Sequence, residues 1–354
     1  MTRESEPRNQ DNDARLQVWA CSSMAEENQS PAEHSEKEVP EELEHDEAPA
    51  NDSSLEESGF AEKKKIGVGF WIATFWLILI TFLAVFAPVL PFKEPNENFI
   101  VFEQKENPIT GKIQDRPIQP PYSPSGDHWL GTDQDARDLL SRSIHGARIS
   151  LAVGALTALF GVVIGGALGM IAGYFKGLLD KIISAIFLVS LSFPGLILAI
   201  LVVALVDRSL ITISVTLGIL GVAPIGRLAR AQTLSFAERE FVLAAETLGA
   251  KKSRILVREL LPNVLIPMST LAMLVIAIAI VAEGTLAFLG LSVQGSSTWG
   301  KLILTGSGLQ TLESSPWVAF VPMGFLFLTV ASFNYMSDRL RDYFDVREIF
   351  VVRD

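Results

Sequence analysis

The sequence predicts an all-α integral membrane protein with six transmembrane helices. Its 354 residues are 49% hydrophobic, and the mean hydropathy of +0.34 is high for a soluble chain of this size. The apolar residues also form six long blocks without Asp, Glu, Lys or Arg, each near or above the roughly 18 to 20 residues that cross a bilayer core. We therefore expect spans over about 66–92, 146–175, 182–206, 209–230, 263–291 and 316–337.

An acidic segment precedes the first span. Residues 1–62 hold 18 Asp and Glu against four Lys and Arg, with few large apolar side chains. Such a composition cannot bury enough surface to offset chain entropy, so we expect a disordered acidic tail. A solvated tail is the favoured interpretation, and a segment that recruits a partner is the alternative. The single cysteine, Cys21, lies here and excludes an internal disulfide.

Basic residues orient the spans. With the N-terminus in the cytosol, 16 Lys and Arg lie inside and nine outside, and seven of those nine fall in the long 93–148 connection, where the bias is weak. Both termini are therefore predicted to be cytosolic, with the loop over 93–145 outside. Its many prolines predict extended coil laid over the outer face.

The end of this external loop is polar. Thr132 or Asp133 could cap a short helix that leads into the second span. His128, Asp133, Asp135 and Asp138 also raise the possibility of a metal site. There is no second His or Cys nearby and no fixed ligand spacing, so a capped helix start is favoured and no metal is predicted.

The second span carries glycines at steps of four. Such a stripe lets a neighbouring helix come close, as in other interfaces built from small residues. The stripe can pack against a helix of this chain or against a helix of a partner subunit. The glycine pattern is equally consistent with both. The predicted helix-packing positions are Gly161, Gly165, Gly169 and Gly173.

Glu283 is an acidic residue at membrane depth, in the span over 263–291. Glu283 lies near the outer end of that span, so a capping or gate-lining role is favoured over a proton relay. A secondary transporter would need several ionisable groups at the midplane. Such a transporter, or a channel that acts alone, is kept as the alternative function.

A charged amphipathic insert over 232–262 separates the fourth and fifth spans. Phe241, Ala244, Ala245 and Leu248 occupy i, i+3, i+4 and i+7 of a predicted helix that ends at Gly249, and Pro262 opens the next span. The small apolar face favours docking to a protein groove over lying on lipid.

A segment over 295–302 is similar to a phosphate-binding loop. Its last position is Leu302, which cannot coordinate magnesium, and no strand precedes it. We therefore expect no nucleotide site and no cofactor on this chain.

Four motifs together resemble one family. They lie at 128–138, at 146–151, in the insert through Leu261-Pro262-Asn263, and at 282–291 with Trp299-Gly300. With them, the chain from about residue 66 to 348 resembles the C-type permease subunit of the dipeptide/oligopeptide/nickel ABC importers, and the implied permease transmembrane domain, of type I architecture, covers 63–354.

The resemblance implies a function and a set of partners. The function is a permease that forms half of a pathway for short peptides or related solutes in the bacterial cytoplasmic (inner) membrane. The implied partners are a homologous second permease, two cytosolic ATPase subunits that carry ATP and Mg, an extracytoplasmic solute-binding protein and membrane lipid, with no nucleic acid. The chain itself would not be an enzyme.

The resemblance also implies that the insert is a coupling helix that contacts an ATPase. The corresponding residues are Phe241, Leu243, Ala244, Ala245, Glu246, Leu248, Gly249 and Pro262. Two positions depart from the family pattern: Leu243 stands where the family has Glu, and Glu259 where it often has His. The departure at Leu243 puts the usual polar contact with the ATPase in question.

Overall fold

A computed structural model describes the chain over residues 67–106 and 113–344. The predicted tail over 1–62 lies outside the described residues. Helices dominate, as predicted. Five of the described helices are long and apolar enough to span a membrane. If a pair of helices that meet at a sharp bend is counted as one span, the number of spans rises to six.

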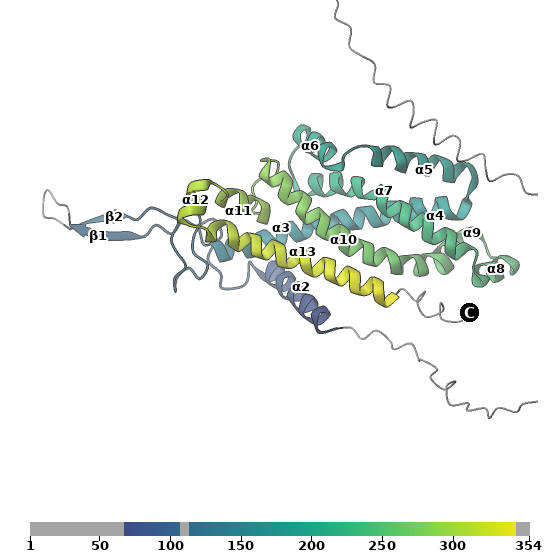
Figure 1. Ribbon diagram of the computed structural model, residues 1–354, viewed down its shortest axis with the longest axis horizontal. Helices are drawn as coiled ribbons and strands as arrows, with labels where there is room; N and C mark the ends of the chain where they lie inside the picture. The colour runs from purple at the N-terminus through teal and green to yellow at the C-terminus, as the bar shows by residue number, and fades with distance from the viewer. Residues whose placement is uncertain (1–66, 107–112, 345–354) are drawn as a thin grey trace, which may run out of the picture. The chain divides into compact units, whose positions relative to one another are not determined.

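The helices follow one another along the chain in Figure 1. They are α2 (Val68–Phe86), α3 (Leu139–Phe160), α4 (Gly166–Phe175), α5 (Gly177–Ser192), α6 (Gly195–Leu205), α7 (Leu210–Ala237), α8 (Glu240–Thr247), α9 (Lys252–Arg254), α10 (Leu261–Phe288), α11 (Trp299–Gly306), α12 (Leu309–Ser314) and α13 (Trp317–Phe344).

Two π-helical turns lie within the long helices. One, η1 (Gly161–Gly165), joins α3 to α4, so that 139–175 forms one helical span. The other, η2 (Ile255–Leu260), joins α9 to α10. Pro262 follows η2 and has no N–H to donate, so a widened turn at this point accommodates the missing bond. Helix therefore runs unbroken from Lys252 to Phe288, and Pro262 lies inside it rather than opening it.

The predicted span over 182–206 is not one straight helix. It divides into α5 and α6, which are bent by 83° at Phe193 and Pro194. Pro194 precedes the first residue of α6 with φ −62° and ψ 112°, an extended conformation that stops α5. The proline within this predicted span is the sequence signal for a kink or a helix start at 194, and the structure confirms it.

The loop before α3 is more ordered than extended coil. Strands β1 (Phe102–Glu106) and β2 (Ile113–Pro117) form an antiparallel hairpin, with Phe102 opposite Pro117. The second span also begins earlier than predicted, at Leu139. Its N-cap is Asp138, whose side chain accepts a hydrogen bond from the Ser141 N–H, and not Thr132 or Asp133.

Helices α3, α4, α7, α10 and α13 form the centre of the bundle. Helix α7 lies against α3 and α4, and α10 lies against α3, α7 and α13. Buried aliphatic residues fill the spaces between them, among them Val153 of α3, Ile213 and Ile225 of α7, and Met268 of α10. Helix α2 packs on α13 and α3 at the side of this centre.

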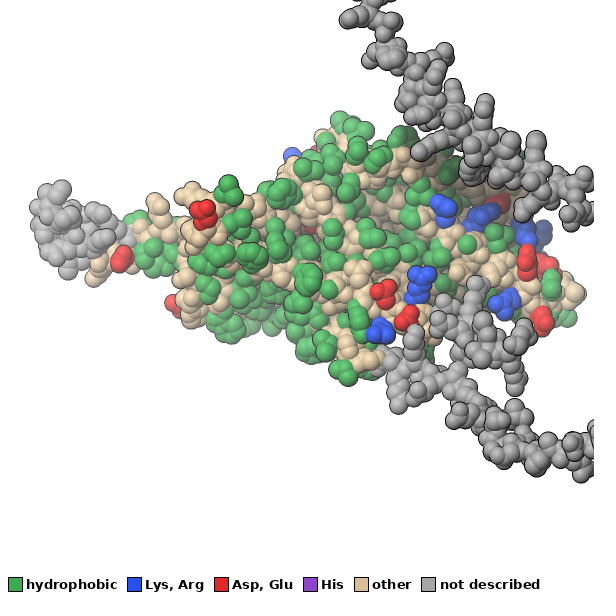
Figure 2. Space-filling view, viewed as in Figure 1, with side chains coloured by type: hydrophobic (Ala, Val, Ile, Leu, Met, Phe, Trp, Pro, Cys, Tyr) green, Lys and Arg blue, Asp and Glu red, His purple; other side chains and the backbone are tan. Residues whose placement is uncertain are grey.

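The outside of the bundle is apolar. Figure 2 shows hydrophobic side chains over the middle of the molecule, with charged side chains gathered towards the end that carries α8. On α2, Trp71, Ile72 and Phe75 are each more than half exposed. Exposed apolar side chains along helices of this length are typical of a surface covered by lipid or by other membrane subunits.

Candidate coupling helix and the groups around it

Helix α8 is held to the bundle by one side. Val242 is 1% exposed and packs with Ile255 and Leu260 of η2, with Tyr174, Phe236 and Ala245 around them. The inner face is therefore built on Val242 and Ala245, which are three positions apart. Val242 is not among the residues that the sequence predicts for the coupling helix.

The rest of α8 faces outward. Leu248 is 87% exposed, Leu243 51% and Phe241 39%, and Ala244 is also exposed. The predicted apolar face needs one correction, because half-buried Ala245 belongs to the inner side. The structure leaves Phe241, Ala244 and Leu248 together on the outside, with Leu243 on a separate edge of the helix.

Gly249 ends the helix, as predicted. Its φ of +75° is a left-handed conformation that favours glycine. The Ala250 N–H donates to the Ala245 carbonyl at 3.0 Å, and the Gly249 N–H to the Glu246 carbonyl at 2.9 Å. These bonds satisfy carbonyls at the end of the helix.

Polar contacts connect α8 and its flanks to neighbouring helices. Tyr174 at the end of α4 donates from its hydroxyl to Glu246 Oε1 at 3.0 Å. Lys176 pairs with Glu238 just before α8 at 3.3 Å. Glu246 therefore links α8 to α4 directly, in addition to the packing contacts. Glu246 was predicted at the coupling helix, but its partner Tyr174 has no sequence signal.

The base of α7 is tied to α5 in the same region. Arg230 Nη2 donates to Asp180 Oδ2 at 2.7 Å, and Arg230 Nε contacts the other carboxylate oxygen. A two-point contact of this kind fixes orientation as well as distance. Helices α4, α5 and α7 thus meet near α8.

The glycine stripe packs within the chain. A Cβ added at Gly165, Gly169 or Gly173 would come within 2.8 Å of a backbone oxygen of α7, in turn that of Val222, Gly226 and Arg230. Gly161 faces Ile225 and Gly221 of the same helix. Of the two possibilities that the sequence left open, the stripe meets an intrachain neighbour.

Glu283 lies in a buried polar cluster near the end of α10. The side chain is 1% exposed, and its Oε1 accepts a hydrogen bond from the Ser292 hydroxyl at 3.0 Å. The Ser292 and Thr298 hydroxyls lie 3.2 Å apart, and Thr298 caps α11. Glu283 therefore ties the connection before α11 to α10, a contact that suits a structural role.

The polar residues before α3 form hydrogen bonds and ion pairs with one another and with the start of that helix. His128 Nδ1 lies 2.9 Å from Asp138 Oδ1, while Asp133 Oδ1 accepts from the Arg137 N–H at 2.9 Å and Oδ2 pairs with Arg142. In the part of the chain that the structure describes, no three His, Cys, Asp or Glu side chains are grouped as metal ligands would be.

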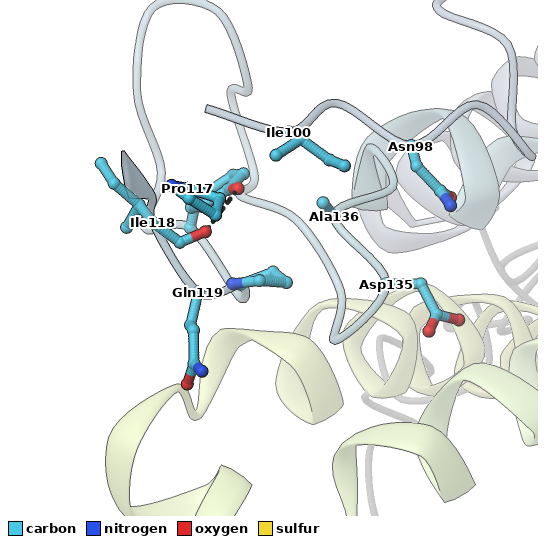
Figure 3. Close-up of a pocket in the computed structure, with 9 residues that line it drawn as sticks. Asn98, Ile100, Pro117, Ile118, Gln119, Asp135 and Ala136 are labelled. Atoms are coloured by element: carbon cyan, nitrogen blue, oxygen red, sulfur yellow. Dashed lines mark hydrogen bonds between the residues drawn. The ribbon is translucent and has the colours of Figure 1, made fainter. Parts of the chain in front are cut away.

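A small recess lies at the base of the hairpin. Figure 3 shows Ile100, Pro117 and Ala136 around it, with Asn98 and Asp135 at one side. Its volume is about 310 Å³. The Tyr122 hydroxyl accepts from the Val101 N–H at 3.0 Å and donates to the Ile118 carbonyl at 3.0 Å, so the recess is fixed in place by loop contacts.

Comparison with known proteins identifies similar chains. The sequence profile described as "Binding-protein-dependent transport system inner membrane component" matches residues 165–349. The dipeptide transport system permease protein DppC of Alkalihalophilus pseudofirmus is 36% identical over 278 residues, covering 77% of this chain and 85% of the relative.

Two further relatives carry related names. The oligopeptide transport system permease protein OppC of Bacillus subtilis is 34% identical, covering 76% of this chain and 82% of the relative. The glutathione transport system permease protein GsiD of Pectobacterium atrosepticum is 37% identical, covering 63% of this chain and 73% of the relative.

Proposed function

Because the chain belongs to the family of binding-protein-dependent transport system inner membrane components, we propose that it is the permease subunit of an ATP-driven importer of short peptides. In this proposal it forms half of the translocation pathway in the bacterial cytoplasmic membrane, with both termini cytosolic. The names of the relatives support the solute class, because dipeptides, oligopeptides and glutathione are all short peptides.

The outward face of α8 carries the proposal. Leu248 and Leu243 are more than half exposed, although the other side of the same helix is buried on Ile255 and Leu260. A rigid helix with a bare apolar face suits docking into a groove of another protein. We propose that two cytosolic ATPase subunits, which carry ATP and Mg, receive this helix and its counterpart on a homologous second permease.

The route from α8 into the bundle supports mechanical coupling. Tyr174 and the packing of Val242 attach α8 to α4 and η2, and η2 continues directly into α10. We propose that ATP-driven movement of the ATPases tilts these helices and opens the pathway to one side at a time. An extracytoplasmic solute-binding protein would deliver the solute at the opposite end.

The alternative is a secondary transporter or channel that works without ATPases. It predicts solute uptake by the chain alone, driven by a gradient. Proton-coupled transport would also need several ionisable groups at the midplane. The buried Glu283, already bonded to Ser292, is a poor candidate for a relay.

Replacement of Leu248 tests the proposal. Since its side chain is 87% exposed, Leu248→Ser should leave folding and membrane insertion unchanged while removing apolar contact with the ATPase. We expect solute-stimulated ATP hydrolysis by the reconstituted complex to fall at least several-fold. The matched control is Leu309→Ser, because Leu309 is 82% exposed on α12, far along the chain from α8. Equal activity of both variants and the parent would contradict the proposal.

A further inference from the structure

A basic cavity of about 330 Å³ lies at the end of the bundle opposite α8. The start of α3 and the connection before α11 form most of its wall, with Pro95 and Asn96 at the edge. Its positively charged or titratable basic side chains are Arg137, Arg142, His145, Arg148 and Lys301. Among the described residues that line it, none is Asp or Glu.

The basic groups are only partly neutralised. Arg137 pairs with Asp135 at 3.3 Å, and Arg142 pairs with Asp133. Within the described ranges, no ion pair involves Arg148 or Lys301. Lys301 Nζ donates to the Ser296 carbonyl at 3.3 Å. The cavity therefore keeps an excess of positive charge.

Arg142 supplies a donor that lacks a partner. The residue is 7% exposed, its Nη1 donates to Asp133, and its Nη2 donates to the Ser297 hydroxyl at 3.4 Å. Its Nε is buried, and no described group accepts from it. An unpaired buried donor is unfavourable, and Arg142 is one of the residues that line the cavity.

We propose that this cavity binds the carboxylate of a small solute, as a first site on the permease at the end where solute is delivered. Identification of the solute as a short peptide with a free carboxylate rests on the proposed function. Guanidinium groups match the planar carboxylate, and Arg142, Arg148 and Lys301 all line the cavity. The volume is at the lower end for ligand pockets, which suits one end of a short peptide.

Chemical protection of Arg148 tests the site directly. Phenylglyoxal modifies accessible arginines, and Arg148 is exposed at the cavity. We would treat the full chain, purified with its partner subunits in lipid nanodiscs, and measure modification of each arginine by mass spectrometry. Dialanine should slow modification of Arg148, while dialanine amide at the same concentration should not. Arg208, which does not line the cavity, is the internal control.

Variants assign the effect to the cavity. Lys301→Gln should raise the dialanine concentration that gives half protection by roughly tenfold, because a charge-assisted contact is lost. Lys93→Gln, which removes a positive charge outside the cavity lining, should leave that concentration unchanged. A loss of protection that is equal in both variants would indicate a general field effect and overturn the site.

Three results would contradict the proposal. Absence of protection by dialanine overturns it, and so does equal protection by the amide. Protection by solute-free binding protein but not by dialanine would assign the cavity to an acidic group of a protein partner. Uptake is measured separately: protection without peptide uptake would contradict the proposed function and leave the carboxylate site standing, whereas uptake without protection would contradict only the site.

Discussion

At the scale of single residues, Leu243 is the informative position. It stands where the family pattern has Glu, and its side chain is 51% exposed on an edge of α8 away from Phe241. An apolar side chain left in water is unfavourable by roughly 1–2 kcal/mol relative to burial. We therefore expect Leu243 to enter an apolar pocket on its ATPase, which would have lost the group that receives a Glu.

Two substitutions test this expectation. Leu243→Glu should weaken coupling with the native ATPase, because a carboxylate buried without a partner is costly. Leu243→Met keeps volume and polarity and should be nearly neutral. ATP hydrolysis and solute uptake are measured for both in the same membranes. Equal or higher coupling with Glu would mean that the residue faces solvent in the complex.

At the scale of elements, the contact between α4 and α7 depends on absent side chains. A Cβ at Gly169 would collide with the Gly226 carbonyl oxygen, with Ala229 Cβ and with the Arg230 backbone nitrogen, so the helices would have to separate. Overpacking of this kind costs about 1–3 kcal/mol. The consequence extends to α8, because Tyr174 at the end of α4 holds Glu246.

Paired alanine substitutions measure this packing. Gly169→Ala should lower the thermal unfolding temperature of the purified protein by several degrees. Gly166→Ala is the matched control, because a Cβ there meets the tip of the flexible Met268 side chain, which can move aside. Both variants gain the same helix propensity, so their difference reports packing. Similar unfolding temperatures would show that α4 and α7 tolerate a wider separation.

At the scale of the whole molecule, the acidic tail and the helical bundle are expected to contribute separately. Deletion of residues 1–60 should leave transport within about twofold, because a segment of this composition adds little to a packed core. Uptake by the truncated and full-length chains at equal membrane levels checks this. Loss of assembly with the partner subunits on deletion would instead show that the tail is a docking element.

The sequence alone determined the membrane class, the family and the position of the short helix that ends at Gly249. Long uncharged blocks are a local property of composition, and a helix that ends at Gly249 follows from apolar spacing and from the left-handed conformation that glycine favours. The motifs of the resemblance are local as well, and the profile match over 165–349 confirms the family.

Only the tertiary structure decided which surfaces meet. It placed the glycine stripe against α7, turned Val242 and Ala245 inward, and gathered Arg142, Arg148 and Lys301 around one cavity. Each of these features joins residues that are distant in sequence or depends on the direction of a helix after a turn. Sequence periodicity predicts that a helix has an apolar or small-residue face. It does not predict which helix packs against that face, because this depends on the packing of the whole bundle.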